Sequence, residues 1–298
     1  MIRRLLLAGA AFTAACATGS RGTPAVAAPA LTPAPGAPTT APAGEAPSAH
    51  HADVVRYGPS ALRYVVHRRL HIQQALGDQT QAQDVGARIF VATAITGPAD
   101  SIGYPATFLV DSIVADSGTP PPIVDNISKV RKLVFAGRVA PRGEFVNAVA
   151  SDSAVAQSVV QLLGTFRDFL PRLPVGGLKL GSAWTDTVET SQKGSGSEVS
   201  RRTITLATAA GWEDRLGTRS VRVEGSQTYR VAGGGKNAGQ PFELSGAGTG
   251  SGVAYIAADG RYLGGESQDS TTLTVRLPVQ GVAVPVIQVT RTTVVVQP

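Results

Sequence analysis

The sequence has one cysteine, few aromatic residues and little net charge. Cys16 is the only cysteine among 298 residues, so the chain cannot form an internal disulfide. Aromatic residues make up 5% of the chain and do not alternate with basic residues, which argues against nucleic-acid binding. The formal net charge is +6, or +4 without Arg3 and Arg4. Such a mild charge favours solubility or attraction to anionic surfaces.

Motifs of several enzyme classes are also missing. The chain has no Gly-x-Ser-x-Gly elbow, and we interpret the glycine-rich run from Gly248 to Gly252 as a flexible turn. Gly235-Lys236 lacks the upstream glycine of a phosphate-binding loop and is followed by Asn237. We therefore expect a protein that is not an enzyme. A carboxylate pair for glycoside cleavage stays open among six residues of the second half, although scattered surface carboxylates explain them more simply: Glu213, Asp214, Glu224, Glu243, Glu266 and Asp269.

The four histidines offer little for a metal site or a catalytic triad. His50 and His51 lie in or beside a proline-rich segment. On a helix, His67 and His71 would share one face and could share a metal. The alternation that begins at Leu62 instead favours a strand, where four residues span ~13 Å. We predict no metal and no cofactor, and a Ser-His-Asp triad would have to recruit one of these two histidines.

The N-terminus has the three zones of a secretory signal. Arg3 and Arg4 precede an uncharged, mostly apolar run over 5–15, which ends in small residues before Cys16. This run is too short for a transmembrane helix, which needs ~20 apolar residues. Residues 1–15 are therefore predicted to be a signal peptide.

The residues before Cys16 resemble the lipobox of exported bacterial lipoproteins. The resemblance rests on Leu6, Leu7 and the run Thr13-Ala14-Ala15-Cys16, with Thr13 at the position where leucine is commonest. It implies that Cys16 becomes the first mature residue and carries acyl chains. The protein would then be anchored in a membrane, on the periplasmic face of the envelope or at the cell surface.

Residues 16–54 are predicted to form a disordered tether behind the lipidated cysteine. Most of this segment is Ala, Pro, Thr, Gly and Ser, with prolines at 24, 29, 33, 35, 38, 42 and 47. Such a composition buries too little apolar surface to offset chain entropy. At ~3.1 Å per residue for proline-rich chain, the tether would hold the body at most about 100 Å from the membrane.

Residues 55–298 are predicted to be one large, mainly β domain. The stretches 64–66, 104–114, 273–277 and 289–296 show the alternation of β-branched and aromatic residues that is typical of strands. Asp259-Gly260, between two such runs, is a hairpin signal, whereas Gly233-Gly234-Gly235-Lys236-Asn237 is interpreted as punctuation between strands. The pattern indicates an antiparallel sheet folded as a barrel, half-barrel or sandwich with one or two helices packed on it.

A helical insert is predicted at about 120–172. Ser151 to Leu170 repeats apolar residues at helical spacing, with a cap within residues 151–153 and Pro171 as its end. Asp125 to Val134 is a weaker helix pattern. The apolar stripe of the longer helix would lie on the sheet and line a ligand site: Val155, Val159, Leu162, Phe166 and Phe169.

The segment after the insert carries a second resemblance. The run from Leu173-Pro174 through Gly181 to Trp184, followed by a strand, resembles an element of secreted bacterial lipoproteins that are poorly characterised. The layout is also similar to that of periplasmic lipid and lipoprotein carriers, in which a curved antiparallel sheet cups helices around an apolar cavity. On the residues alone, Gly181 is a turn and Trp184 a buried ring.

These observations lead to two functional hypotheses. The first is a membrane-anchored lipoprotein that binds a lipid or another apolar ligand without catalysis. The second is a structural or protein-interaction module of the cell envelope with a solid core. An apolar cavity larger than ~300 Å³ beneath the predicted helix would favour the first hypothesis.

Overall fold

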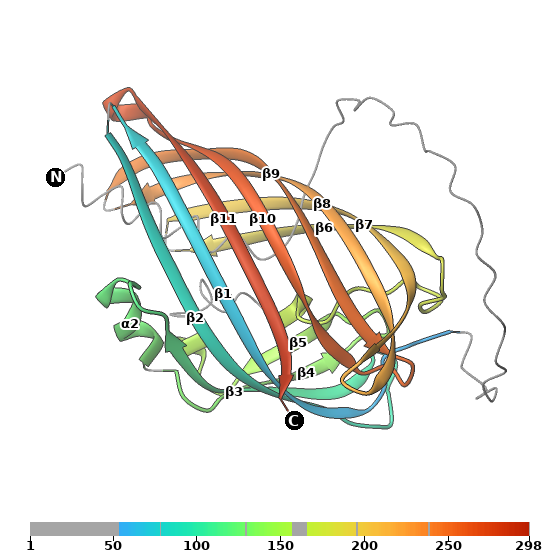
Figure 1. Cartoon of the computed structure of the whole chain (residues 1–298). Helices are drawn as coiled ribbons and strands as arrows, with labels where there is room; N and C mark the ends of the chain where they lie inside the picture. Colours follow the sequence, from blue (N-terminus) through green and yellow to red (C-terminus); the bar gives the residue numbers. More distant parts are fainter. Residues whose placement is uncertain are drawn as a thin grey trace, which may run out of the picture.

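The protein is a single, open, strongly curved antiparallel sheet. The computed structural model describes residues 54–77, 79–128, 130–156, 166–194, 196–237 and 239–297. Within these residues eleven strands pair in the order β5-β4-β3-β2-β1-β11-β10-β9-β8-β7-β6 (Figure 1). The prediction of a mainly β, antiparallel fold with few helices is confirmed, and the single open sheet excludes the sandwich.

Most strands are long. They are β1 (Ser60–Leu76), β2 (Gln79–Ile95), β3 (Tyr104–Ala115), β4 (Leu133–Val139), β5 (Phe145–Ala150), β6 (Ala183–Gly194), β7 (Ser197–Arg215), β8 (Thr218–Asn237), β9 (Gln240–Ala257), β10 (Tyr262–Leu277) and β11 (Val282–Gln297). The helical elements of the described ranges are α2 (Pro121–Ser128), a helical turn at residues 153–156, and the 3-10 turns η2 (Phe166–Asp168) and η3 (Pro278–Gln280). No helix in these described ranges is long and apolar enough to cross a membrane.

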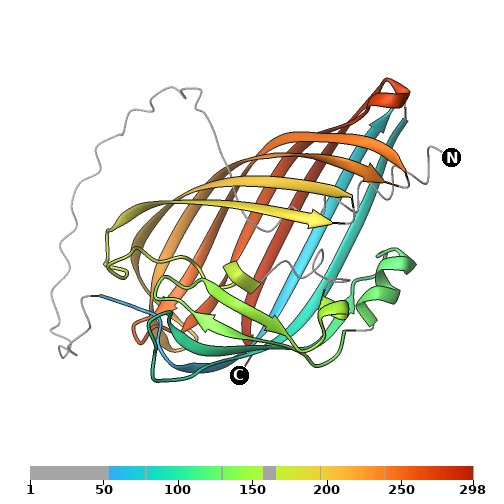
Figure 2. The ribbon, with the colours of Figure 1, turned by 180° about the vertical axis from the view of Figure 1, so that it is seen from behind.

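The two edges of the sheet, β5 and β6, approach each other at one end of the molecule. Viewed from behind, β4 and β5 lie across the lower end of the curved sheet, below the long strands (Figure 2). Arg142, in the turn between β4 and β5, donates from Nη2 to Oδ1 of Asp186 on β6 at 2.8 Å. An ion pair between side chains, rather than a ladder of backbone bonds, therefore links the open edges.

Two apolar clusters fill the concave face, because alternate residues of each strand point to it. The larger cluster lies where β3, β4, β5 and the segment after η2 cover the sheet, and its deeply buried large members include Tyr64, Phe108, Leu173 and Ile256. The smaller cluster occupies the other half of the long strands and includes Leu70, Tyr229, Leu273 and Val286.

The predicted hairpin at Asp259-Gly260 is confirmed. It connects β9 to β10, and the amide of Ala257 donates to the carbonyl of Arg261 at 2.8 Å. Gly260 has a φ of 87°, and a Cβ there would overlap the carbonyl oxygen of Arg56. Only glycine fits this turn, where the incoming chain before β1 crosses it.

Two glycine-rich runs that the sequence pattern assigned to turns lie inside strands. Gly248 to Gly252 belongs to the middle of β9, and Gly233-Gly234-Gly235 belongs to β8. The reason is side-chain room, because a Cβ on Gly248 would overlap the ring of Tyr229. These glycines let neighbouring side chains lie flat against the sheet, so the interpretation as a flexible turn was wrong.

The insert at 120–172 also differs from the prediction. It contains β4 and β5 as well as helical turns, and the weaker helix is Pro121–Ser128 rather than 125–134. Prolines suit the first turn of a helix, which explains its early start. Lys132, with a φ of 56°, lies in the bend between this helix and β4.

The predicted long helix is described only at its two ends. Asp152 caps its start by accepting bonds from the amides of Ala154 and Val155 at 3.0 and 2.9 Å. At the other end the chain forms the 3-10 turn η2, so the helix does not continue to Leu170 as expected. Residues 157–165, with Val159 and Leu162, lie outside the described residues, as do the signal, Cys16 and the tether up to residue 53.

Candidate functional site

A cavity of about 350 Å³ lies between the concave face of the sheet and the covering segment, residues 166–172. Strands from both halves of the sheet form its walls. The apolar part of the lining comes from Val66, Ile89, Val91, Phe166, Phe169, Leu170, Trp184, Val188, Ala207, Val223, Ala254, Tyr262 and Val294. The polar part includes Arg68, Thr190, Thr203, Thr205, Gln227, Ser267 and Thr292.

The described residues of the predicted ligand-lining stripe fall into two groups. Phe166 and Phe169 lie in the wall of the cavity. Val155 is partly buried and packs against the larger apolar cluster, but it is not part of the wall. Two of the five predicted residues therefore meet at the cavity, and Val159 and Leu162 lie outside the described residues.

Aromatic rings hold Phe166 and Phe169 in place. The ring of Phe166 lies 5.4 Å from that of Phe108 and 5.2 Å from that of Phe135. Phe169 makes an edge contact with Tyr64 at 5.2 Å. Such contacts add ~0.5–1.5 kcal/mol each beyond the burial of area, so this wall is packed rather than loosely covered.

Buried tyrosines fix the backbone at this end of the cavity. The hydroxyl of Tyr57 donates to the carbonyl of Pro171 at 2.6 Å, and that of Tyr64 donates to the carbonyl of Tyr262 at 2.9 Å. Burial, followed by the nearby Tyr262 and Tyr64, raises the pKa of Tyr57 well above its usual value. The hydroxyl of Tyr57 therefore joins the covering segment to the chain before β1, and that of Tyr64 joins β1 to β10.

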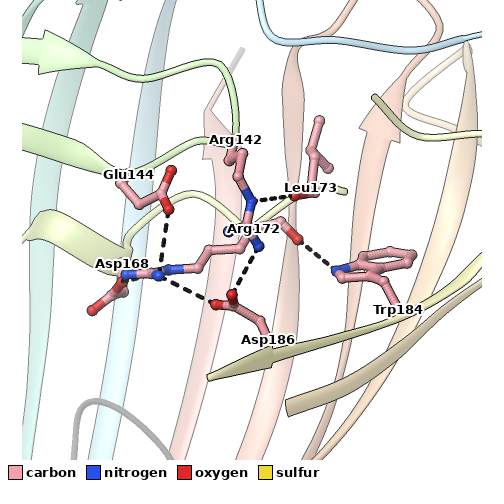
Figure 3. A network of polar contacts seen from close by, with 7 residues as sticks. All are labelled: Arg142, Glu144, Asp168, Arg172, Leu173, Trp184 and Asp186. Carbon is pink, nitrogen blue, oxygen red and sulfur yellow. Dashed lines mark hydrogen bonds and ion pairs between the residues drawn. The ribbon is translucent and has the colours of Figure 1, made fainter. Parts of the chain in front are cut away.

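An ion cluster, called here the Arg172 cluster, joins the covering segment to both edges of the sheet (Figure 3). Arg172 contacts Asp168 at 2.6 Å, Asp186 at 3.2 Å and Glu144 at 3.4 Å. Arg142 bonds to Asp186 and also donates from Nε to the carbonyl of Leu173 at 3.0 Å. The indole of Trp184 donates to the carbonyl of Arg172 at 3.2 Å.

All three carboxylates of the Arg172 cluster are matched by guanidinium groups. Burial alone would raise the pKa of Asp186, but the hydrogen bond from Arg142 and the charges of Arg142 and Arg172 outweigh it and lower that pKa. Burial likewise disfavours the charge of Arg172, yet the attraction to Asp168, Glu144 and Asp186 raises its pKa. Asp186 and Arg172 are therefore both held in their charged forms, and the cluster positions the covering segment.

A second polar cluster lies within the concave face, between the cavity and the smaller apolar cluster. Asp269 on β10 is 8% exposed and lies close enough to Arg68 on β1 and Arg201 on β7 for both charges to act on it. Gln227 donates to Oδ1 of Asp269 at 3.3 Å. The guanidinium of Arg201 lies 4.0 Å above the ring of Tyr229, whose hydroxyl bonds to Thr271. These residues are called here the Asp269 cluster.

Burial dominates the electrostatics of the Asp269 cluster. It raises the pKa of Asp269 to about 6, although the charges of Arg201 and Arg68 act in the opposite direction. Burial also lowers the pKa of Arg68 to about 10, while Asp269 opposes that change. Arg68 therefore remains charged at neutral pH.

Sequence reasoning missed this cluster. Asp269 was interpreted as one of several surface carboxylates, and no role was predicted for Arg68 or Arg201. The available signal was the position of the charged residue in the alternation of its strand. Arg68 follows Tyr64 and Val66 and precedes Leu70 on the inward face of β1. A charged residue in phase with buried apolar neighbours indicates an inward-pointing charge.

The other sequence candidates do not come together. His67 and His71 both lie on β1, as the alternation predicted, and they bond to different partners, Asp116 at 2.7 Å and Asp84 at 2.9 Å. The described part of the chain holds no group of three or more His, Cys, Asp or Glu residues suited to a metal. The carboxylates other than Asp269 that were left open for glycoside cleavage are exposed: Glu213, Asp214, Glu224, Glu243 and Glu266.

Gly181 and Trp184 take the positions that the local pattern suggested. Gly181 has a φ of 73° in the turn before β6, and Trp184 is partly buried at the cavity wall.

No model of a known protein family matches the sequence, and no curated protein matches it.

Proposed function

We propose that this protein is a membrane-anchored envelope lipoprotein that binds a small apolar or amphiphilic ligand in the cavity beneath the covering segment. The observation that carries the proposal is the cavity itself. Its volume of about 350 Å³ falls in the lower part of the ~300–1,000 Å³ range of small-molecule sites. Its lining is mainly apolar with a few convergent polar groups, as in such sites.

The size of the cavity limits the ligand class. A volume near the lower end of the range suits one hydrocarbon chain or one small ring system rather than a whole multi-chain lipid. The wall formed by Phe166 and Phe169 is held by packed aromatic rings. A ligand would therefore enter a largely preformed space, which reduces the entropic cost of binding.

The anchor is a separate part of the proposal. Cys16 would carry the acyl chains, and residues 17–54 would separate the binding domain from the membrane. This part is supported by the order of charged, apolar and small residues before Cys16. The binding proposal does not depend on it.

A cavity-filling substitution tests the binding proposal. Ala207 on β7 lies in the wall and is 8% exposed, whereas its neighbour Leu206 points to the outer face and is 57% exposed. Ala207→Phe should occupy the space and lower the affinity for a fluorescent apolar dye such as ANS at least ~10-fold, the effect of losing roughly 1.4 kcal/mol of binding free energy. Leu206→Phe is the matched control and should bind like the wild type.

The stability of both variants is measured in parallel by urea unfolding. A folded Ala207→Phe protein that binds the dye as strongly as the wild type would contradict the proposal. Absence of saturable dye binding to the wild type would do the same, and would leave the structural or interaction module as the better hypothesis.

A further inference from the structure

We infer that the ligand has an uncharged headgroup with a hydroxyl, and that Thr203, Thr205 and Gln227 bind this headgroup in the cavity. The inference rests on the proposed function, since it names the class of ligand for the same cavity. All three residues belong to the cavity wall. Thr203 and Thr205 are successive inward-pointing residues of β7, and Gln227 on β8 lies opposite Thr205 in the sheet register. These three residues are called here the Thr203 group.

The side of the cavity next to the covering segment is apolar. One register row across five neighbouring strands forms it, and all members of that row line the cavity: Val66, Val294, Gly265, Ala254 and Val223. Gln227 follows Val223 by four residues on β8, which corresponds to ~13 Å along the strand. The cavity therefore offers separate places for an apolar tail and a polar headgroup.

The hydroxyl of Thr203 lacks a hydrogen-bond partner among the described residues, although only 2% of this residue is exposed. The hydroxyl of Thr205 likewise has no partner in the described part of the chain. Buried polar groups are nearly always hydrogen-bonded, because an unmade bond costs the full desolvation of the group. Since both side chains lie in the cavity wall, a ligand can supply the missing bonds.

The amide of Gln227 determines which headgroup fits. Its Nε2 donates to Oδ1 of Asp269 at 3.3 Å, so Oε1 remains as an acceptor, and no described residue donates to it. A ligand hydroxyl can donate to Oε1 of Gln227 and accept from a threonine hydroxyl. An ionised carboxylate cannot donate, and it would place its charge against Oε1.

Charged headgroups are also disfavoured by the surroundings of the Thr203 group. Burial raises the pKa of the neighbouring Asp269 to about 6, although the charges of Arg201 and Arg68 act in the opposite direction. Desolvation thus outweighs attraction for a carboxylate at this place, and a ligand carboxylate would meet the same cost. An ammonium headgroup would face the positive charge of Arg68, which is part of the same wall.

Four probes with the same phenylbutyl body test the inference by calorimetric titration at neutral pH: 4-phenyl-1-butanol, butylbenzene, 4-phenylbutanoate and 4-phenylbutylammonium. The alcohol should bind the wild type at least as tightly as butylbenzene, because the Thr203 group replaces the hydrogen bonds that the hydroxyl loses with water. Without such partners, desolvation of the hydroxyl would make the alcohol the weaker ligand. Both ions should bind more weakly than the alcohol.

Variants of Thr203 locate the effect. Thr203→Val removes the hydroxyl and keeps the shape, so it should weaken the binding of the alcohol ~2- to 10-fold, the range of one neutral hydrogen bond, without weakening that of butylbenzene. Thr203→Ser keeps a hydroxyl and should retain the binding of the alcohol. Thr208→Val, at an exposed threonine of the same strand, is the matched control and should bind all probes like the wild type. Thr205→Val repeats the test at the neighbouring hydroxyl if Thr203→Val does not fold.

The outcomes separate the two proposals. If none of the probes binds the wild type, the proposed function fails, and with it the inference. If butylbenzene binds more tightly than the alcohol, or if either ion does, the cavity is still a ligand site but the uncharged hydroxyl headgroup is wrong. A folded Thr203→Val protein that binds the alcohol as tightly as the wild type would overturn the role of Thr203.

Discussion

Replacing Asp269 by asparagine should make the protein more stable at neutral pH. The carboxyl is buried, and its pKa rises from 3.8 in the unfolded chain to about 6 in the fold. The folded state therefore binds this proton more tightly than the unfolded state does. The resulting stabilisation is fully present below the unfolded pKa and is lost as the pH rises through about 6.

The size of the effect follows from the pKa difference. About two units correspond to ~3 kcal/mol of unfolding free energy, at ~1.36 kcal/mol per unit. About 2 kcal/mol of this should be lost between pH ~4.5 and ~7.5, because part of the titration lies below that window. An asparagine side chain resembles the protonated form of Asp269, so the variant should gain ~2 kcal/mol relative to the wild type over the same interval.

Urea unfolding followed by tryptophan fluorescence at the two pH values measures this difference. Other titrating groups act in both proteins, so the comparison uses the stability of the variant minus that of the wild type. Asp214→Asn, at an exposed carboxylate, is the control and should show no comparable step. A variant that loses stability relative to the wild type as the pH rises would refute the reasoning, since it would mean that the two arginines stabilise the ionised carboxylate more than burial destabilises it.

Three further changes test separate parts of the molecule. Gly248→Val should destabilise the fold by several kcal/mol in urea unfolding, because its Cβ would overlap the ring of Tyr229, whereas Gly211→Ala, with open space around the new Cβ, should have a small effect. Phe166→Ala should cost ~3–5 kcal/mol by the same assay, and unchanged stability together with unchanged dye binding would place this residue outside the core and the site. Cys16→Ser should abolish labelling with radioactive fatty acid and membrane association in a bacterial host, and retained labelling would rule out this cysteine as the anchor.

The sequence contained enough information for the type of fold but not for its closure. Alternation of β-branched residues identifies strands locally, and Asp259-Gly260 identifies one hairpin, because both signals act over a few residues. The join between the edges depends on Arg142 and Asp186, which are 44 residues apart and carry no local pattern. Pairings of this range cannot be derived from periodicity alone.

The glycine runs show the opposite failure of local signals: here a local signal was present, but it predicted the wrong structure. Glycine usually marks turns, so the run 248–252 gave a local signal for a break in the chain. The strand persists because the side chains of Tyr229 and Asp269, on the two neighbouring strands, occupy the space that side chains of β9 would take. The same glycines therefore make room for the Asp269 cluster, which the sequence reading placed on the surface.

The Asp269 cluster also bears on the choice between a binding protein and a module with a solid core. Buried ion clusters seldom add stability, and well-packed apolar residues of similar volume are often as stable or more so. The raised pKa of Asp269 indicates a net cost of ionisation even with two arginines nearby. A protein whose concave face served only as a core would gain by replacing Arg68, Arg201 and Asp269 with apolar residues. Arg68 also lies in the wall of the cavity of about 350 Å³, where a bound ligand would meet it, so the position of this charge fits the binding proposal better than a solid core.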